Sequence, residues 1–252
     1  MQSHSFVSLF VLAAVVATAT IMVLYYPVAL VWTTYEDLYG EWTQLYLFAV
    51  TMVLATRLAF IRIPHRVFFA LLALACLYVV GEEISWGQRL LDFESPDIFK
   101  LHNLQREANI HNLFVGPYST VLKDVIEYSL ATALVLYGVI YPLTLRWGWQ
   151  PAVWMDTRLR LAAPPLYLAP FFATAAPLEI GLFHFNEAEF AEILVGFALF
   201  NMSAHYWFAD RKRLQVHTPP RWPGKDSKRF ALIILAVTGM VCGLAYATTS
   251  AL

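Results

Sequence analysis

Long apolar runs, separated by short polar connections, dominate the chain. A helix that crosses a bilayer needs about 20 mostly apolar residues, and seven stretches meet this condition. They cover residues 6–31, 45–63, 67–86, 120–145, 164–185, 188–208 and 230–249. Each run is apolar on all sides, whereas a surface helix of a soluble protein keeps one polar face. The pattern predicts an all-α, polytopic membrane protein with about seven transmembrane helices in a single membrane domain over residues 1–252.

The basic residues predict which side of the membrane each connection faces. If the N-terminus is cytoplasmic, alternate connections hold 13 of the 17 lysines and arginines, and short basic loops stay in the cytoplasm. This orientation places the C-terminus outside, a long loop at 87–119 outside, and a basic linker at 209–229 in the cytoplasm. It also places 15 of the 18 acidic residues on the outer side or in the outer halves of the spans.

Composition agrees with a lipid environment. The chain is 59% hydrophobic and 14% charged, whereas soluble domains carry about 25% charged residues. A net charge of −1 gives no basic field that would attract nucleic acid. The N-terminal apolar run exceeds the roughly 7–15 residues of a signal-peptide core, which favours a retained first span. We therefore predict a multi-pass protein of the cell membrane, with the lipid bilayer as partner and no nucleic acid.

Several carboxylates fall within the apolar runs, and five of them are singled out as costly to place there. They are Glu82, Glu83, Glu127, Glu179 and Glu192. A charged residue at mid-span costs about 2.5–3.5 kcal/mol on insertion scales, so such groups are protonated, paired, hydrated or metal-bound. Hydrogen bonding between helices is the purely structural interpretation. The functional interpretation is a polar pocket that opens outward, because the topology gives these side chains a similar outer depth.

Residues 81–113 form the densest polar segment. Glu82, Ser85 and Arg89 share one face if the helix continues through them. Ser-Pro at 95–96 breaks the chain, and an amphipathic helix is predicted at 97–112, along the outer membrane surface. On that helix Glu107 and His111 are four residues apart and project from one face.

A carboxylate and an imidazole at this spacing can bind one divalent metal, although a solvated pair is the alternative. Zinc, iron or manganese suits such ligands, and a metal-bound water becomes a hydroxide nucleophile near neutral pH. In this hypothesis Glu82 or Glu83 is the general base, and Arg89 or Arg106 binds a phosphate or carboxylate of the substrate. The predicted ligands are Glu107, His111, His184, Glu179 and Glu192. The histidines on the cytoplasmic side, His4, His65, His205 and His217, are expected to be solvated or to snorkel.

The strings GEEISWGQR at 81–89 and NLQREANIHN at 103–112 resemble a segment of an uncharacterised family of bacterial multi-pass membrane proteins. The resemblance covers about 35 residues and implies a bacterial inner-membrane location. It implies that the family motif consists of Glu82, Glu83, Trp86, Gln88, Arg89, Asn103, Gln105, Glu107, Asn109, His111 and Asn112.

A second resemblance, in topology and residue type alone, is to the alkaline-ceramidase-like membrane hydrolases. Those proteins use zinc to cleave lipid amides and place two histidines one turn apart in the last span. Residues 230–249 contain no histidine, so no ligand position is carried over from that family.

Three functions remain open from the sequence. The first is a metal-dependent hydrolase that acts on a lipid or lipid-linked substrate at the outer leaflet. The second is a non-catalytic subunit or assembly factor that docks other membrane-protein subunits. The third is a proton- or ion-coupled transporter, since carboxylates inside membranes serve as proton relays.

Overall fold

A computed structural model of the chain describes residues 2–34, 39–103, 106–110, 113, 120–181 and 188–211. These residues form helices and connections, and this part of the chain contains no strand. The predicted all-α fold is therefore confirmed. The predicted seventh span at 230–249 and most of the basic linker at 209–229 lie outside the described residues.

The long helices follow the predicted apolar runs. They are α1 (Gln2–Tyr25), α2 (Pro27–Thr34), α3 (Tyr39–Phe60), α4 (Arg66–Glu83), α7 (Thr120–Val135), α10 (Ala169–Glu179) and α11 (Ala188–Arg211). Shorter elements connect or extend them: η1 (Ser85–Gly87), α5 (Gln88–Leu91), α6 (Asp97–His102), the π-helical η3 (Leu136–Ile140), α8 (Tyr141–Arg146), α9 (Gln150–Thr157) and η4 (Leu166–Leu168).

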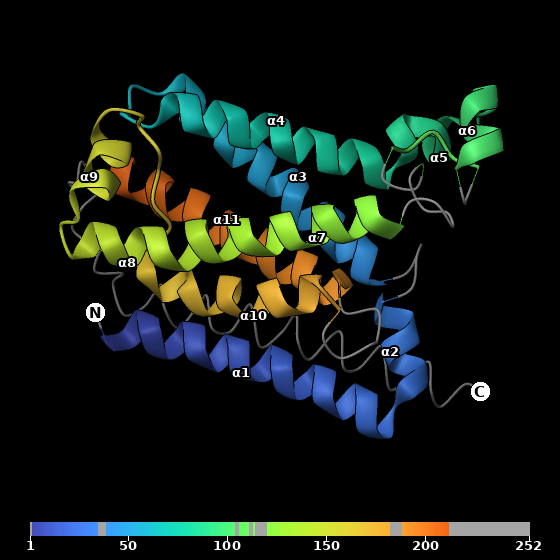
Figure 1. Cartoon of the computed structure of the whole chain (residues 1–252), viewed down its shortest axis with the longest axis horizontal. Coiled ribbons are helices and arrows are strands. Elements are labelled where there is room, and N and C mark those ends of the chain that lie inside the picture. Colours follow the sequence, from blue (N-terminus) through green and yellow to red (C-terminus); the bar gives the residue numbers. More distant parts are fainter. Residues whose placement is uncertain are drawn as a thin grey trace.

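The long helices lie side by side as a bundle with two distinct ends. Helix α9 lies at one end, and α5 and α6 lie beyond α4 at the opposite end (Figure 1). Helix α3 packs against α4 and α11, and α10 packs against α7 and α11. The shared core includes the fully buried side chains of Phe69, Phe171, Phe172 and Met202.

Two helical stretches of the described residues are long and apolar enough to cross a membrane. They are Tyr39–Phe60 and Lys123–Arg146, and only 28% of the apolar window of each is buried inside the protein. A core helix of a soluble protein would be mostly buried. Exposed apolar area of this extent marks contact with lipid or with another protein.

The second of these stretches is a continuous helix with a π-turn. Pro142 lacks a backbone N–H and its ring crowds the carbonyl four residues earlier, at Gly138. A π-turn over Leu136–Ile140 is a common way to relieve such crowding. Gly138 also lets α10 approach closely, because a Cβ there would lie 2.0 Å from the Phe172 side chain.

One predicted run gives a shorter helix than expected. Within 164–185 the α-helix α10 covers 11 residues, Ala169–Glu179, after the single turn η4. Pro165 precedes that turn with extended backbone (φ −56°, ψ 136°). It has no backbone N–H to donate to an earlier carbonyl, so the helix is not continued toward its N-terminus through this residue. The helix ends at Ile180 and Gly181, the latter with φ +63°, which favours glycine.

Two helical predictions around the outer loop are wrong. The run 67–86 is helical only to Glu83, so Ser85 does not continue the helical face of Glu82. The predicted helix 97–112 ends at His102, and Asn103 is extended. Residues 106–110 are not helical, and Arg106 has φ +60°. The reason is that side chains of Asn, Ser and Gln in this segment bond the backbone groups that a helix would use.

Candidate functional site

The chain leaves α4 through a left-handed turn at residues 85–87. The φ angles are +48° at Ser85, +52° at Trp86 and +91° at Gly87, and non-glycine residues in this region cost about 1–3 kcal/mol each. The indole N–H of Trp86 donates to Glu82 Oε1 at 2.7 Å. Its ring covers Gly81, where a Cβ would lie 2.9 Å from the ring atoms. Gly81 and Glu82 thus hold the strained turn in place.

The same turn binds the second half of the sequence motif. Glu82 Oε2 accepts the backbone N–H of Ile110 at 2.6 Å. The Ser85 hydroxyl donates to Glu107 Oε2, and the Asn109 side-chain amide donates to Ser85 Oγ at 3.2 Å. These bonds join residues more than 20 positions apart, so the segments 81–88 and 103–110 form one interlocked loop.

Gln88 and Asn103 complete this loop. Gln88 Oε1 accepts the Ser95 hydroxyl at 3.0 Å and the backbone N–H of Ala108 at 2.8 Å. Asn103 donates its side-chain amide to the backbone oxygen and to Oδ1 of Asn109, both at 2.8 Å. Both asparagines are buried. The bonds explain why the chain turns at Asn103 instead of continuing as a helix.

The carboxylates of Glu82 and Glu107 both accept hydrogen bonds from residues of this loop. Glu82 is 3% exposed and each of its carboxylate oxygens accepts an N–H. Glu107 accepts the Ser85 hydroxyl and, at 3.3 Å, the Asn109 amide. The predicted roles of Glu82 as a base and Glu107 as a metal ligand stay predictions. What the contacts add is that both carboxylates position the loop.

Glu83 faces the bundle instead of the loop. The side-chain amide nitrogen of Gln44 in α3 donates to Glu83 Oε1 at 3.1 Å and also to Glu192 Oε2 in α11. Gln44 is 2% exposed, and its Oε1 has no hydrogen-bond partner among the described residues. One buried amide therefore connects carboxylates from two other helices.

A third carboxylate, which is buried, extends this group. Glu179, at the end of α10, is 7% exposed, and its Oε2 lacks a hydrogen-bond partner within the described part of the chain. It interacts electrostatically with Glu127 of α7 and Glu189 of α11. Glu192 in turn interacts with Glu179 and with Glu41 of α3. We call the set the carboxylate cluster; it comprises Gln44 with Glu41, Glu83, Glu127, Glu179, Glu189 and Glu192.

The structure brings Glu83, Glu179 and Glu192 into one cluster, whereas Glu82 bonds within the interlocked loop. The predicted outward-facing pocket and the roles of these residues stay predictions. The side chain of Arg89, and residues His111 and His184 entirely, lie outside the described part. Among the described residues, no group of three or more His, Cys, Asp or Glu side chains is arranged to hold a metal ion. The predicted metal site therefore stays a prediction that depends on the two histidines. Gln44, which the sequence interpretation missed, was visible as an uncharged polar residue within α3.

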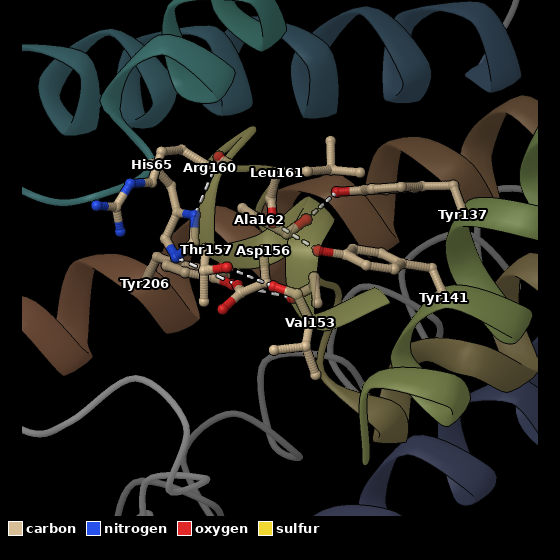
Figure 2. Close-up of polar contacts among 11 residues, drawn as sticks. His65, Tyr137, Tyr141, Val153, Asp156, Thr157, Arg160, Leu161, Ala162 and Tyr206 are labelled. Carbon is tan, nitrogen blue, oxygen red and sulfur yellow. Dashed lines mark hydrogen bonds and ion pairs between the residues drawn. The ribbon is translucent and has the colours of Figure 1, made fainter. Parts of the chain in front are cut away.

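Basic side chains gather at the opposite end of the bundle. We call it the arginine end; its exposed arginines are Arg57, Arg62, Arg66, Arg146, Arg158 and Arg160. Asp156 of α9 is buried there and faces His65 (Figure 2). His65 and His205 are both buried, so the expectation that they are solvated or snorkel is wrong. Their partners come from distant parts of the chain, which is why the sequence did not reveal their burial.

The connection 158–163, which follows α9, is held to the bundle by its backbone. Three tyrosine hydroxyls donate to its carbonyls: Tyr137 to Ala162 at 2.8 Å, Tyr141 to Leu161 at 2.8 Å and Tyr206 to Ala163 at 3.0 Å. Figure 2 shows Tyr137 and Tyr141 reaching toward this segment from one side and His65 from the other. We call residues 158–163 the strap.

Comparison of the chain with protein-family models, with curated protein sequences and with solved structures finds no match. The resemblance of residues 81–112 to a bacterial membrane family accordingly stays a prediction. What the structure adds is a physical role for several residues of that segment, since Glu82, Gln88, Asn103 and Asn109 all bond within the interlocked loop.

Proposed function

We propose that this chain is a multi-pass integral membrane protein whose carboxylate cluster binds and releases protons near the outer surface, as part of proton-coupled transport. The observation that carries the proposal is the Gln44 amide shared between Glu83 and Glu192 inside the bundle. Glu179 and Glu41 interact electrostatically with Glu192, and Glu127 and Glu189 interact in turn with Glu179.

The membrane location rests on exposed apolar surface around the bundle. Tyr46, Val53, Leu71 and Leu74 are large side chains of α3 and α4 that are at least half exposed. In water such surface would be costly, whereas in a bilayer it faces hydrocarbon. The proposed topology has seven spans with the N-terminus in the cytoplasm, and the arginine end then faces the cytoplasm as short basic connections do.

Proton binding follows from the chemistry of the cluster. Like charges in close proximity disfavour ionisation of all members, and burial disfavours it further. Within the described residues the exposed arginines lie mainly at the other end of the bundle, and Lys123 forms an ion pair with one cluster member, Glu127, at 3.6 Å. Carboxylates on different helices that share one proton donor suit proton exchange.

A flux measurement tests the proposal. The full chain is reconstituted in liposomes that contain a pH-sensitive dye, and an acid pulse is applied outside. We expect proton entry above that of empty liposomes, reduced about tenfold or more in Glu192→Gln, which keeps the shape but cannot ionise. Glu94→Gln, in an exposed side chain, is the matched control and should behave as the wild type. Entry equal to that of empty liposomes would contradict a transport function.

A metal-dependent hydrolase of a lipid or lipid-linked substrate is the second candidate, with zinc, iron or manganese as its ion. The observation that favours it is that Glu82 fixes Ile110, which directly precedes His111, while Glu107 is fixed in the same loop. Metal analysis of the purified protein, with Glu107→Ala and His111→Ala as variants, separates the two candidates. Stoichiometric metal that both variants lose would support the hydrolase. With neither metal nor flux, a subunit that docks other membrane proteins would remain.

A further inference from the structure

One buried carboxylate of the cluster has an oxygen without a hydrogen-bond donor. Glu179 is the last residue of α10 and is 7% exposed, and its Oε2 atom lacks a partner among the described residues. The buried carboxylate of Glu82 differs, because each of its oxygens accepts an N–H. A buried acceptor without a donor is rare in proteins and calls for a physical explanation. A proton is the ligand that a carboxylate oxygen in this position can take up directly.

Glu179 connects a carboxylate at the surface with the centre of the cluster. Helix α10 packs against α7 and α11, and α7 begins, α10 ends and α11 begins at the same end of the bundle (Figure 1). Glu179 interacts electrostatically with Glu127 of α7, whose side chain is 25% exposed. Glu192 of α11 interacts in turn with Glu179 and accepts the Gln44 amide. The carboxylates therefore form a series that starts at Glu127, continues through Glu179 and ends at Glu192.

The neighbours of Glu179 have reasons to stay ionised that Glu179 lacks. Glu127 forms an ion pair with Lys123, at 3.6 Å across one turn of α7. Glu189 lies in the first turn of α11, where the helix dipole favours a negative charge. Glu179 occupies the last position of α10, where the helix dipole disfavours a carboxylate. Of these three carboxylates, Glu179 is thus the one that gains most from taking up a proton.

We propose that Glu179 is the entry relay of the carboxylate cluster, which takes up a proton by way of Glu127 and passes it to Glu192. The inference rests on the function proposed above and adds to it the relay residue and the order of transfer. Each transfer moves one proton between two carboxyl groups, so the donor becomes a carboxylate and the acceptor a carboxylic acid. No other reactant is needed. Chains of acidic side chains serve as proton relays in membrane pumps and transporters.

Gln44 gives a reason for the proton to move on to Glu192. Its side-chain nitrogen donates to Glu192 Oε2, and its own Oε1 has no hydrogen-bond partner among the described residues. A protonated Glu192 can supply the missing donor, since a carboxylic acid carries one O–H. The Oε2 atom of Glu179 has no such partner. The proton is therefore bound more weakly on Glu179 than on Glu192, as a relay requires.

The other charged groups near Glu179 define the controls. Glu189 of α11 interacts with Glu179 and offers an alternative entry. Asp124 of α7 is exposed and precedes Glu127 by one turn. Helix α1, η3 and η4 also contact α10, and none of the three contains an acidic residue, a lysine or an arginine. Glu127→Gln and Glu189→Gln therefore distinguish the two routes, and Asp124→Asn is the matched control.

Time-resolved infrared spectroscopy of the full chain in lipid nanodiscs tests the relay. After a rapid drop in pH, the protonated-carboxyl band reports how fast and how far the cluster is protonated, and Glu192→Gln identifies the part that belongs to Glu192. In Glu179→Gln this part should rise about tenfold more slowly, because a positioned proton-transfer group is missing, and still reach almost its wild-type size. Glu127→Gln should slow the rise by a smaller factor, because water also supplies protons at the surface. Glu189→Gln and Asp124→Asn should keep the wild-type rate.

A wild-type rate in Glu179→Gln would overturn the relay, although the band itself would still support proton binding by the cluster. Slowing in Glu189→Gln but not in Glu127→Gln, or equal slowing in Asp124→Asn and Glu127→Gln, would overturn entry through Glu127. If Glu179→Gln does not fold, Glu127→Gln at its partly exposed position decides, since a wild-type rate there contradicts the proposal. A wild-type protein without any protonated-carboxyl band would contradict the function proposed above, and the relay with it.

Discussion

The two ends of the bundle differ in the sign and in the exposure of their charged side chains. At one end several carboxylates are buried or half-buried and bonded to groups from other segments, as in the bridge from Gln44 to Glu83 and Glu192. At the other end the arginines are exposed, and neutral tyrosines hold the strap through its backbone. Burial of charge is costly, so the buried Glu82 and Glu179 indicate a site, whereas the exposed arginines fit the proposed cytoplasmic orientation of their end. The His65–Asp156 pair is the exception within the arginine end.

The largest single effect on stability should come from the interlocked loop. Glu82→Ala removes the acceptor of both the Trp86 indole and the Ile110 backbone N–H. Hydrogen bonds to a charged partner contribute about 1.5–3 kcal/mol, so we expect a loss near 3 kcal/mol in the free energy of unfolding. Thermal unfolding in detergent measures it. Glu94→Ala, at an exposed position, should leave the midpoint almost unchanged, and equal losses in the two variants would contradict the buried role of Glu82.

A smaller loss should follow from crowding the strained turn. Gly81→Ala places a Cβ about where the Trp86 ring lies, 2.9 Å from its atoms. Overpacking costs about 1–3 kcal/mol, and the half-exposed ring can move to relieve part of it, so we expect about 2 kcal/mol. The fluorescence of Trp86 should shift as the ring becomes more solvated. Wild-type stability in this variant would mean that the ring does not cover Gly81.

The arginine end should lose less from a single change. Tyr141→Phe removes one hydroxyl that donates to the Leu161 carbonyl. A neutral hydrogen bond contributes about 1 kcal/mol, and two further tyrosines and His65 still hold the strap. Hydrogen–deuterium exchange of the strap amides should rise by less than tenfold. Complete loss of protection would show that the strap depends on Tyr141 alone.

The smallest effect concerns the exposed ion pair of the outer loop. The hydrogen bond from Lys100, followed by the charge of Lys100, holds the pKa of Glu94 below its ordinary value. A carboxyl group whose pKa is lower in the folded than in the unfolded protein stabilises the folded state at pH values above its unfolded pKa. This stabilisation is lost as the pH falls through the folded pKa. Because the pair is fully solvated, Lys100→Ala should return the pKa of Glu94 to its ordinary value without a measurable change in stability. An NMR titration of Glu94 checks the pKa. A pKa that stays low in Lys100→Ala would show that another group sets it.

The comparison also separates what the sequence could predict from what it could not. The apolar runs predicted α1, α3 and α11, because continuous apolar composition is a local signal. The pocket expected from Glu82, Glu83, Glu127, Glu179 and Glu192 stays a prediction, although Glu83, Glu179 and Glu192 belong to one cluster. The seven-span topology and its orientation stay predictions.

The wrong predictions share one physical cause, which is contacts of side chains with residues that are distant in the sequence. Residues 97–112 have a helical pattern, yet Asn103 and Asn109 bind each other and end the helix at His102. The left-handed backbone at Ser85 and Trp86 has no local sequence signal, since neither residue type favours positive φ. Likewise, His65 is buried through a partner 91 positions away in the chain, Asp156, at a distance that periodicity cannot detect.

Infrared spectroscopy of the carboxyl groups in nanodiscs tests the central claim most directly, because protonated carboxyls absorb apart from carboxylates. We predict that an acid pH step produces a protonated-carboxyl band from a site shielded from water, that Glu192→Gln removes most of it, and that Glu94→Gln leaves it intact. A band of the same size in Glu192→Gln and in the wild type would contradict proton binding by the carboxylate cluster.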